Sequence, residues 1–487
     1  MGQRTIDIDP ITRLEGHGKI RIFLDDDGDV DRAVLQVPEL RGFEQFCLGR
    51  PAEEMPRLTP RICGVCPTAH HLAAAKAVDQ VFGVEPPAAA TKIRELMHSA
   101  FMAEDHILHF FFLGGPDFVV GPQAPAKDRN ILGVIAKVGM EVAGRVLEMR
   151  KRCRAVLTLI GGKAIHPVCA LPGGVSKPLS EDDRKTILDA AELAVDFCQF
   201  ALQVFDDVVL QNQDYVDLIL GDTYQNRTHY MGLVDDQGKV SFYDGKVRVV
   251  DPEGQQLALF SASEYEQHIA ERVEPWTFVK FCYLRDKGWS GLVDGPDSGV
   301  FRVAPLARLN VSTGMATPLA QAAHDKLYDV LGGKPVHHTL AFHWARLVEA
   351  LQASERMREL ATDRSITDPK VRNIPAQVTG VGIGIVEAPR GTLIHHYETD
   401  DQGILTGANL IVATQNNAAA LSLSVEGAAK ALIKGGEVSE GLLNMVEMAF
   451  RAYDPCLACA THSFPGTMPL GIDILDAEGR LVRRIER

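Results

Sequence analysis

The sequence of 487 residues predicts an α+β fold that is mainly helical, with a central bundle of long helices and small β-sheets at its periphery. Two observations lead to this fold class. Apolar residues recur at helical spacing over residues 88–159, 180–220 and 318–362. Apolar and polar residues instead alternate over the shorter segments 19–37 and 238–260, where glycines mark turns. Long periodic segments combined with short alternating ones are typical of an α+β chain.

The predicted elements follow one another without a linker. Residues 19–37 alternate around Asp-Asp-Asp-Gly and predict a β-hairpin. A helix is expected to start near Ala69, and residues 380–414 predict strands joined by turns. Two further helices are expected within residues 418–453. Because no tandem repeat or flexible linker interrupts the chain, we expect residues 1–462 to form a single domain.

Composition and charge narrow the possible function classes. The hydrophobic fraction of 46% and the charged fraction of 23% are typical of a soluble globular protein. A formal net charge of −14 disfavours binding to nucleic acid or to an anionic membrane surface. No apolar run reaches about 18 residues, the length that crosses a membrane. The first residues also lack the apolar core of a signal peptide. We therefore expect no direct membrane span.

Four of the nine cysteines form two Cys-x-x-Cys pairs, and a histidine follows each pair. These residues are Cys63, Cys66 and His70 in the first segment and Cys456, Cys459 and His462 in the second. If the two segments meet, four thiolates could hold a structural zinc ion, an iron–sulfur cluster or a catalytic metal centre. The spacing alone leaves all three open. The other five cysteines are scattered singly, which is typical of small buried apolar residues.

Charged residues in short motifs with glycine or proline favour the catalytic centre. They are Glu15 in TRLEGHGK, Glu44 in RGFE, Arg390 in EAPRGT and Asp454 in DPC. Each one alone is more typical of a surface charge or a helix cap. Together they supply a carboxylate for a hard cation, a carboxylate for protons and a guanidinium that balances negative charge. A structural zinc site needs none of these groups.

The segments RICGVCPTAHH and DPCLACATH resemble the N- and C-terminal signatures of [NiFe]-hydrogenase large subunits. TRLEGHGK, RGFE, APRGT and LIVAT resemble further motifs of this family, in the same order. The resemblance extends from about Ile6 to His462 and onward, which is nearly the whole chain. It implies the fold of such a protein, a Ni–Fe(CN)2(CO) centre and a hydrogenase reaction.

Motif positions imply how the cysteines hold the metals. Cys63 and Cys456 are expected as terminal nickel ligands, and Cys66 and Cys459 as ligands that bridge nickel and iron. Soft thiolates suit both metals. The resemblance further implies that H2 is split heterolytically, with the Cys456 thiolate as the base and Glu15 taking the proton onward. Burial near a metal site raises the pKa of a carboxyl group towards neutrality, which suits such a relay.

The resemblance also assigns the groups that surround the metals. Arg390 is expected over the open coordination site, where Asp105 and Asp454 would hold its guanidinium by charge-assisted hydrogen bonds. His70 is expected to hydrogen-bond a bridging thiolate. Pro389, which precedes the arginine, is expected to line the cofactor pocket.

Two further assignments complete the site. Thr414 is expected to hydrogen-bond a cyanide ligand, although its motif reads Ala-Thr-Gln where the family often has Pro-Thr-Thr or Pro-Ser-Thr. Glu44, His462 and the backbone carbonyl of Leu410 are expected to hold Mg²⁺ or a similar divalent ion, because oxygen ligands suit a hard cation.

Partner proteins follow from the same resemblance. We expect no iron–sulfur cluster in this chain, because the remaining cysteines are not clustered, and a small Fe–S subunit with further flavin or Fe–S subunits would carry the electrons. Within the cytoplasmic multimeric class, GGKAIHPVCALPGGVSKPL resembles the viologen-reducing branch linked to heterodisulfide reductase more than the NAD(P)-reducing branch, which is the alternative. A deazaflavin-reducing enzyme, a hydrogen sensor and a structural metal-binding subunit are weaker alternatives.

The resemblance gives the last residues a separate role. In the family, an endopeptidase cuts directly after the histidine of the second signature, once nickel-insertion factors have delivered the metal. Residues 463–487 are therefore expected to be a maturation tail that is cleaved after His462. Alternation in LGIDIL and RLVRRI predicts that the tail forms a hairpin. The alternative is that this hairpin stays attached.

Overall fold

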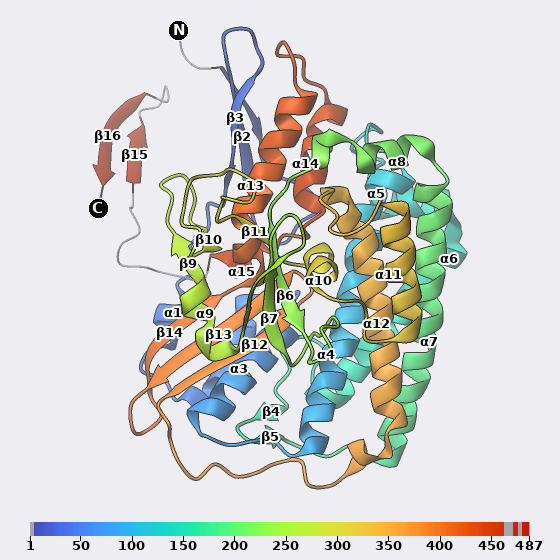
Figure 1. The fold of residues 1–487 in the computed structure, drawn as a ribbon, viewed down its shortest axis with the longest axis vertical. Coiled ribbons are helices and arrows are strands. Elements are labelled where there is room, and N and C mark those ends of the chain that lie inside the picture. Colours follow the sequence, from blue (N-terminus) through green and yellow to red (C-terminus); the bar gives the residue numbers. More distant parts are fainter. Residues whose placement is uncertain (1–3, 462–470, 476–479, 487) are drawn as a thin grey trace.

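The computed structural model describes residues 4–461, 471–475 and 480–486, and it confirms the mainly helical α+β fold (Figure 1). Four long helices pack side by side along one side of the molecule. They are α4 (Ala88–Leu108), α6 (Ile131–Gly161), α7 (Glu181–Phe205) and α12 (Phe342–Thr362), with α11 (Pro318–Val330) packed against α12. Helix α12 is buried on nearly every face, so it forms the centre of this bundle.

The ends of these helices follow from the local sequence. Asn130 starts α6 by accepting hydrogen bonds from two backbone N–H groups, and Ser180 forms a capping box at the start of α7. The segment of residues 88–159, which predicts long helices, is divided after α4. There the chain forms a π-helical segment, η3 (His109–Gly114), and the short helix α5 (Gly115–Val119), where Gly-Gly-Pro disfavours a regular helix.

The predicted N-terminal hairpin is confirmed as part of a three-stranded antiparallel sheet. Strand β1 (Arg4–Ile8) pairs with β2 (Lys19–Leu24), which pairs with β3 (Val30–Gln36) in the register Lys19↔Gln36. A second sheet has the order β11-β6-β7-β8 and contains the segment predicted from residues 238–260. Its strands are β6 (His229–Val234), β7 (Lys246–Val250), β8 (Gln256–Phe260) and β11 (Phe301–Arg302), and only β11 runs parallel to its neighbour β6.

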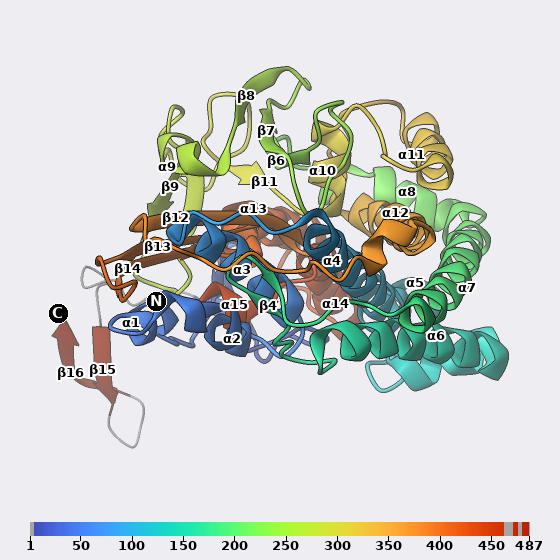
Figure 2. The same cartoon turned by 90° about the horizontal axis from the view of Figure 1, so that it is seen from below.

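The third sheet is small, as expected, but it is not peripheral. It consists of β12 (Val381–Ala388), β13 (Gly391–Thr399) and β14 (Leu405–Ile411), and β12 and β13 are almost entirely buried. Figure 2 shows β12 and β13 between α3 (Pro67–Val81) and the β6–β7 layer. Gly382 and Gly384 allow α3 to come close, because a Cβ at either position would collide with a backbone carbonyl of that helix.

The C-terminal part of the chain returns to the core. Helices α13 (Ala413–Leu432) and α14 (Glu440–Arg451) confirm the two predicted helices, and α15 (Leu457–Ala460) follows the second one. Strands β15 (Gly471–Leu475) and β16 (Leu481–Glu486) pair antiparallel, which confirms the hairpin predicted for the tail. Across the described ranges, no helix has the length and apolarity needed to cross a membrane.

Shorter elements connect these layers. They are α1 (Phe43–Cys47), α2 (Met55–Leu58), β4 (Ala170–Leu171), β5 (Gly174–Val175), α8 (Gln213–Leu220), α9 (Tyr265–His268), β9 (Ile269–Arg272), β10 (Phe281–Leu284) and α10 (Pro305–Val311).

Candidate metal centre

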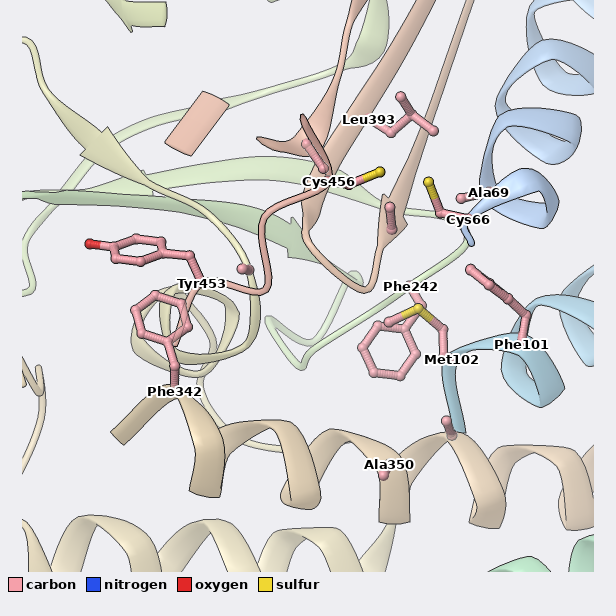
Figure 3. Close-up of a cluster of buried hydrophobic side chains, with 14 of the residues drawn as sticks. Cys66, Ala69, Phe101, Met102, Phe242, Phe342, Ala350, Leu393, Tyr453 and Cys456 are labelled. Carbon is pink, nitrogen blue, oxygen red and sulfur yellow. The ribbon is translucent and has the colours of Figure 1, made fainter. Parts of the chain in front are cut away.

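The four paired cysteines converge at one buried point, although Cys63 and Cys456 are 393 positions apart in the sequence. The Sγ atoms of these two residues lie 3.2 Å apart, as do those of Cys66 and Cys459. All four sulfur atoms lie within 4.8 Å of one another. Figure 3 shows the sulfurs of Cys66 and Cys456 pointing towards each other between α3 and the C-terminal segment. The structure therefore brings together the four thiols that the two motifs predict.

The first pair is held mainly by its own loop. Cys63 follows a 3-10 turn, η2 (Thr59–Ile62), and Cys66 directly precedes α3, which starts at Pro67 rather than near Ala69. The Sγ atom of Cys63 accepts hydrogen bonds from the backbone N–H groups of Val65, at 3.1 Å, and of Cys66, at 3.4 Å. Backbone donors and a helix N-terminus both favour thiolate, so the local fold prepares this pair for a metal.

The second pair is held by residues from distant parts of the chain. The backbone N–H of Cys456 donates to Thr414 Oγ1 at 3.0 Å, and the N–H of Leu457 donates to the Glu15 carbonyl at 3.0 Å. Gly16 lies against this segment with a φ of 83°, and a Cβ there would come within 2.8 Å of the Ala458 nitrogen. Only glycine fits at that position without strain. The motif TRLEGHGK thus packs directly on the second pair.

The electrostatics of the thiols fit a bound cation. Hydrogen bonds from the other three cysteines hold the pKa of Cys63 well below its usual value. Burial raises the pKa values of Cys456 and Cys459 well above the usual value, and hydrogen bonding with neighbouring sulfurs alters them further. Four thiolates cannot share one buried site without a positive charge to offset them. Soft metal ions such as nickel and iron supply that charge, so the donor set fits the implied centre.

Arg390 lies beside the sulfurs and contacts both carboxylates that the resemblance names as its partners. Its Nη2 atom forms an ion pair with Asp454 at 2.9 Å, its Nε donates to the Asp454 carbonyl at 2.8 Å, and its Nη1 lies 3.3 Å from Asp105. Burial alone would lower the pKa of Arg390, but the charges of Asp105 and Asp454 outweigh it and raise that pKa. Burial raises the pKa of Asp454 to about 7, although Arg390 opposes the shift. The guanidinium is therefore fixed and permanently charged.

Glu15 places a carboxylate in direct contact with the sulfur of Cys456. Its Oε2 atom lies 3.0 Å from Cys456 Sγ and accepts a hydrogen bond from the N–H of Ala458 at 3.2 Å. Burial raises the pKa of Glu15, and the negative charge of Cys63 raises it further. A carboxyl group whose pKa is raised, in hydrogen-bond contact with a thiol, is suited to exchange a proton with it.

His70 lies on α3, one turn after Cys66, and it is completely buried. Its Nδ1 atom is 3.1 Å from His395 Nε2, and His395 Nδ1 is 2.6 Å from the Tyr397 hydroxyl. Neither His395 nor Tyr397 was predicted from the sequence. Their spacing of two residues on β13 places both side chains on the same face, and that periodicity in LIHHY was the available signal.

A buried ion-pair network beneath the Arg390 turn was also missed. The guanidinium of Arg308 donates to both carboxylate oxygens of Glu349, at 2.7 and 2.6 Å, and to Glu387 at 2.6 Å. It also donates to the carbonyl of Pro389 at 3.1 Å. All three charged side chains are fully buried. Pro389 thus accepts a bond that anchors the turn on which Arg390 is presented.

The residues of the expected second metal site are partly described. The backbone N–H of Leu410 donates to Glu44 Oε1 at 2.8 Å, so the side chain of Glu44 lies beside this backbone segment. His462 lies outside the described residues. The contact that the structure describes is therefore between Glu44 and the N–H of Leu410, not the expected carbonyl ligand of that residue.

Comparison with known proteins points to a nickel-dependent hydrogenase, in agreement with the four-thiol site. The profile of the nickel-dependent hydrogenase family matches residues 41–137 and 144–462, and a HoxL-like profile matches residues 5–40. The iron-sulfur subunit of an F420-non-reducing hydrogenase from Archaeoglobus profundus is 49% identical over 99% of both chains. The beta subunit of the NAD-reducing hydrogenase HoxS of Cupriavidus necator is 39% identical over 98% of this chain and 99% of its own.

A solved structure shows that the likeness extends to the fold. The NAD⁺-reducing [NiFe]-hydrogenase in the H2-reduced state matches with a TM-score of 0.88 and 40% sequence identity, over 94% of this chain and 99% of that chain. The four converging thiols, the profile match and the coverage of whole relatives agree. The chain belongs to the nickel-dependent hydrogenase family, and within it to the large subunits of [NiFe] hydrogenases.

Proposed function

We propose that Cys456 and Glu15 are the first two proton carriers when this protein splits H2 into protons and electrons. The observation that carries the proposal is the 3.0 Å contact between Cys456 Sγ and Glu15 Oε2 inside the four-thiol site. Cys63, Cys66, Cys456 and Cys459 would together hold a nickel–iron centre with CO and cyanide ligands. When bound, this centre supplies the Lewis acidity and redox capacity for heterolytic cleavage.

The protein side chains then handle the proton. Cys456 Sγ accepts it as the thiolate, and Glu15 Oε2 takes it over the 3.0 Å contact. The N–H of Ala458 keeps Glu15 in place during this exchange. Two electrons leave for each H2 that is split, so the reaction balances only when a partner accepts them.

Arg390 has a separate part in this proposal. Its charge is attracted to the thiolates of Cys456 and Cys66, and two carboxylates fix its orientation. A permanent cation beside the open coordination site of the metals would stabilise negative charge that develops there. Its tight hold on Asp105 and Asp454 keeps it from moving into the site.

His70 and Thr414 would orient the ligands of the centre. His70 forms a pair with His395, which fixes its ring, and the ring would hydrogen-bond a bridging thiolate. The Thr414 hydroxyl accepts the N–H of Cys456 and can also donate, which suits a bond to cyanide. Glu44, whose carboxylate lies beside the Leu410 backbone, would hold a magnesium-type ion together with the Leu410 carbonyl and His462.

We infer that a small Fe–S subunit carries the electrons to a flavin or heterodisulfide-reductase type of acceptor in the cytoplasm. The higher identity to the F420-non-reducing relative than to the NAD-reducing one supports this branch over NAD(P). The natural complex, purified anaerobically, tests it by H2 oxidation with NAD, NADP and viologen. We expect reduction of viologen alone. Rapid reduction of NAD, with a co-purifying NAD-binding flavoprotein, would contradict the choice of acceptor.

Cleavage after His462 by an endopeptidase, following nickel insertion, is also proposed. The mass of the intact large subunit in the active complex is the test. We expect a chain that ends at His462, without residues 463–487. A chain that still ends at Arg487 in active enzyme would refute the cleavage.

A further inference from the structure

A buried cluster of charged side chains joins the N-terminal segment around Arg13 to the end of α14 at Arg451. Its centre is Asp117 on α5, which is 1% exposed. One carboxylate oxygen accepts a hydrogen bond from Arg13 Nη2 at 2.6 Å, and the other accepts one from Arg451 Nη1 at 2.6 Å. A single carboxylate therefore bridges a residue from the N-terminal segment and a residue from the end of α14.

Both partners of Asp117 are close in sequence to the proposed proton carriers. Arg13 precedes Glu15 by two residues, and Arg451 precedes Cys456 by five. The two segments then meet again at the metal centre, where Glu15 forms a bridge-type backbone pair with Cys456. The N-terminal segment and the segment after α14 are thus joined twice, once through Asp117 and once through the Glu15–Cys456 contact.

Further bonds hold the same two segments against the residues that precede Asp117. Arg13 Nη1 donates to the Leu113 carbonyl at 2.8 Å, and His109 Nε2 donates to the Arg451 carbonyl at 3.0 Å. Leu113 and His109 both belong to the π-helical segment η3, an irregularity often found at functional sites. The segment from His109 to Asp117 therefore bonds to both Arg13 and Arg451.

The cluster is balanced in charge. Asn444 accepts from Arg13 at 3.0 Å and donates to Asp117 at 3.1 Å, and Glu447 pairs with Arg451 at 2.5 Å. Burial alone would raise the pKa of Asp117, but Arg451 and Arg13 outweigh it and lower that pKa. Such a buried network with balanced charges resists displacement, because removing one partner leaves an uncompensated charge.

We propose that Asp117 is a positioning residue that sets the distance between Glu15 and Cys456. It acts through Arg13 on one side and Arg451 on the other, rather than by touching the reacting groups. The inference rests on the proposed role of Glu15 as proton carrier. A displacement of about 1 Å between reacting groups can lower a rate about a hundredfold, so small changes in this cluster are expected to be measurable.

The test compares Asp117→Asn with Asp79→Asn in the purified complex. Asp79 is a matched control, because it is also a buried carboxylate paired with an arginine, Arg94 at 2.5 Å. Unlike Asp117, it does not pair with Arg13 or Arg451. We expect D117N to keep its nickel and to exchange H2 with D2O about ten- to a hundredfold more slowly. We expect D79N to change that exchange by no more than about twofold.

A double variant separates positioning from a general loss of structure. If Asp117 acts through Glu15, D117N adds no more than about twofold to the loss already caused by Glu15→Gln. Full multiplication of the two losses would overturn the inference alone. An E15Q variant with normal exchange would overturn the proposed proton relay, and the inference with it.

Amide hydrogen exchange of the complex gives a readout that does not depend on turnover. The N–H groups of Leu457 and Ala458 donate to Glu15, so D117N should speed their exchange, whereas D79N should not. If D117N does not fold, Arg13→Gln removes only the half-buried N-terminal arm of the cluster and should show the same pattern. Unchanged protection of both amides in either variant would refute the proposal.

Discussion

The two cysteine pairs reach the same metal centre by different means. The first pair is arranged by neighbours in its own loop, where two backbone N–H groups point at Cys63 Sγ and α3 begins directly after Cys66. The second pair is held by distant residues, since Thr414 lies 42 positions and Glu15 441 positions from Cys456. The first half of the site is thus mainly local, apart from a contact of His166 with the Cys63 carbonyl, and the second half is assembled by the tertiary fold.

This difference predicts where the site is sensitive. Changes in the first pair should act through the sulfur ligands themselves. The second pair should respond also to residues that touch no metal, because long-range hydrogen bonds define its position. The following predictions test that contrast, from the largest expected effect to the smallest.

Replacing a sulfur in either pair should have the largest effect. We expect Cys456→Ser and Cys63→Ser to abolish H2 oxidation, because oxygen is a poor substitute for a soft thiolate at nickel. Cys198→Ser is the control, since Cys198 is a buried single cysteine that contacts Ser354 on α12. Retained turnover in C456S would refute the assignment of its thiolate as the base.

Glu15→Gln should come next. The amide keeps an oxygen for the N–H of Ala458 but cannot take up the proton, so we expect exchange of H2 with D2O to slow about a thousandfold while nickel stays bound. Glu39→Gln, at the partly exposed partner of His17, should leave the exchange unchanged. Normal exchange in E15Q would mean that the proton leaves by another route.

Arg390→Lys should have a smaller but clear effect. Lysine keeps the charge but loses the planar fork that binds Asp105 and Asp454 together, so we expect H2 oxidation to fall about a hundredfold with nickel retained. The surface substitution Arg152→Lys, at an exposed helical ion pair, provides a control for handling and assembly. Equal activities of R390K and R152K would show that the guanidinium geometry is not needed.

Thr414→Val should have the smallest of these effects. It leaves the buried N–H of Cys456 without its acceptor, which should lower the free energy of unfolding by about 1–3 kcal/mol. Thermal unfolding of the complex measures this loss. Thr158→Val, at an exposed position on α6, should be close to neutral. If T414V unfolds like the wild type, the second pair does not depend on this long-range bond.

Local sequence was sufficient to predict much of the fold and the central residues of the site. Helical and alternating periodicity predicted the long helices, the N-terminal hairpin and the strands after residue 380, and the paired cysteines marked the centre. The position of the β12–β13–β14 sheet could not be read in this way, because strands buried on both faces lose the alternation that marks a surface sheet.

The buried residues that contact the site from distant segments could not be predicted from the sequence, for a related reason. His395, Arg308 and Asp117 are ordinary residues within their own segments, and their roles arise only when distant elements pack together. The tertiary fold, rather than the neighbours in sequence, decides which charges are buried. Motif reasoning therefore found the four cysteines that converge and missed the buried residues that pack around them.

Metal analysis of the anaerobically purified complex tests the central claim most directly. We predict nickel and iron in the wild-type complex and loss of nickel from the C63S and C456S variants, since both sulfurs belong to the one four-thiol site. Zinc alone, without nickel and iron, would contradict the account of this site as the metal centre of a hydrogenase.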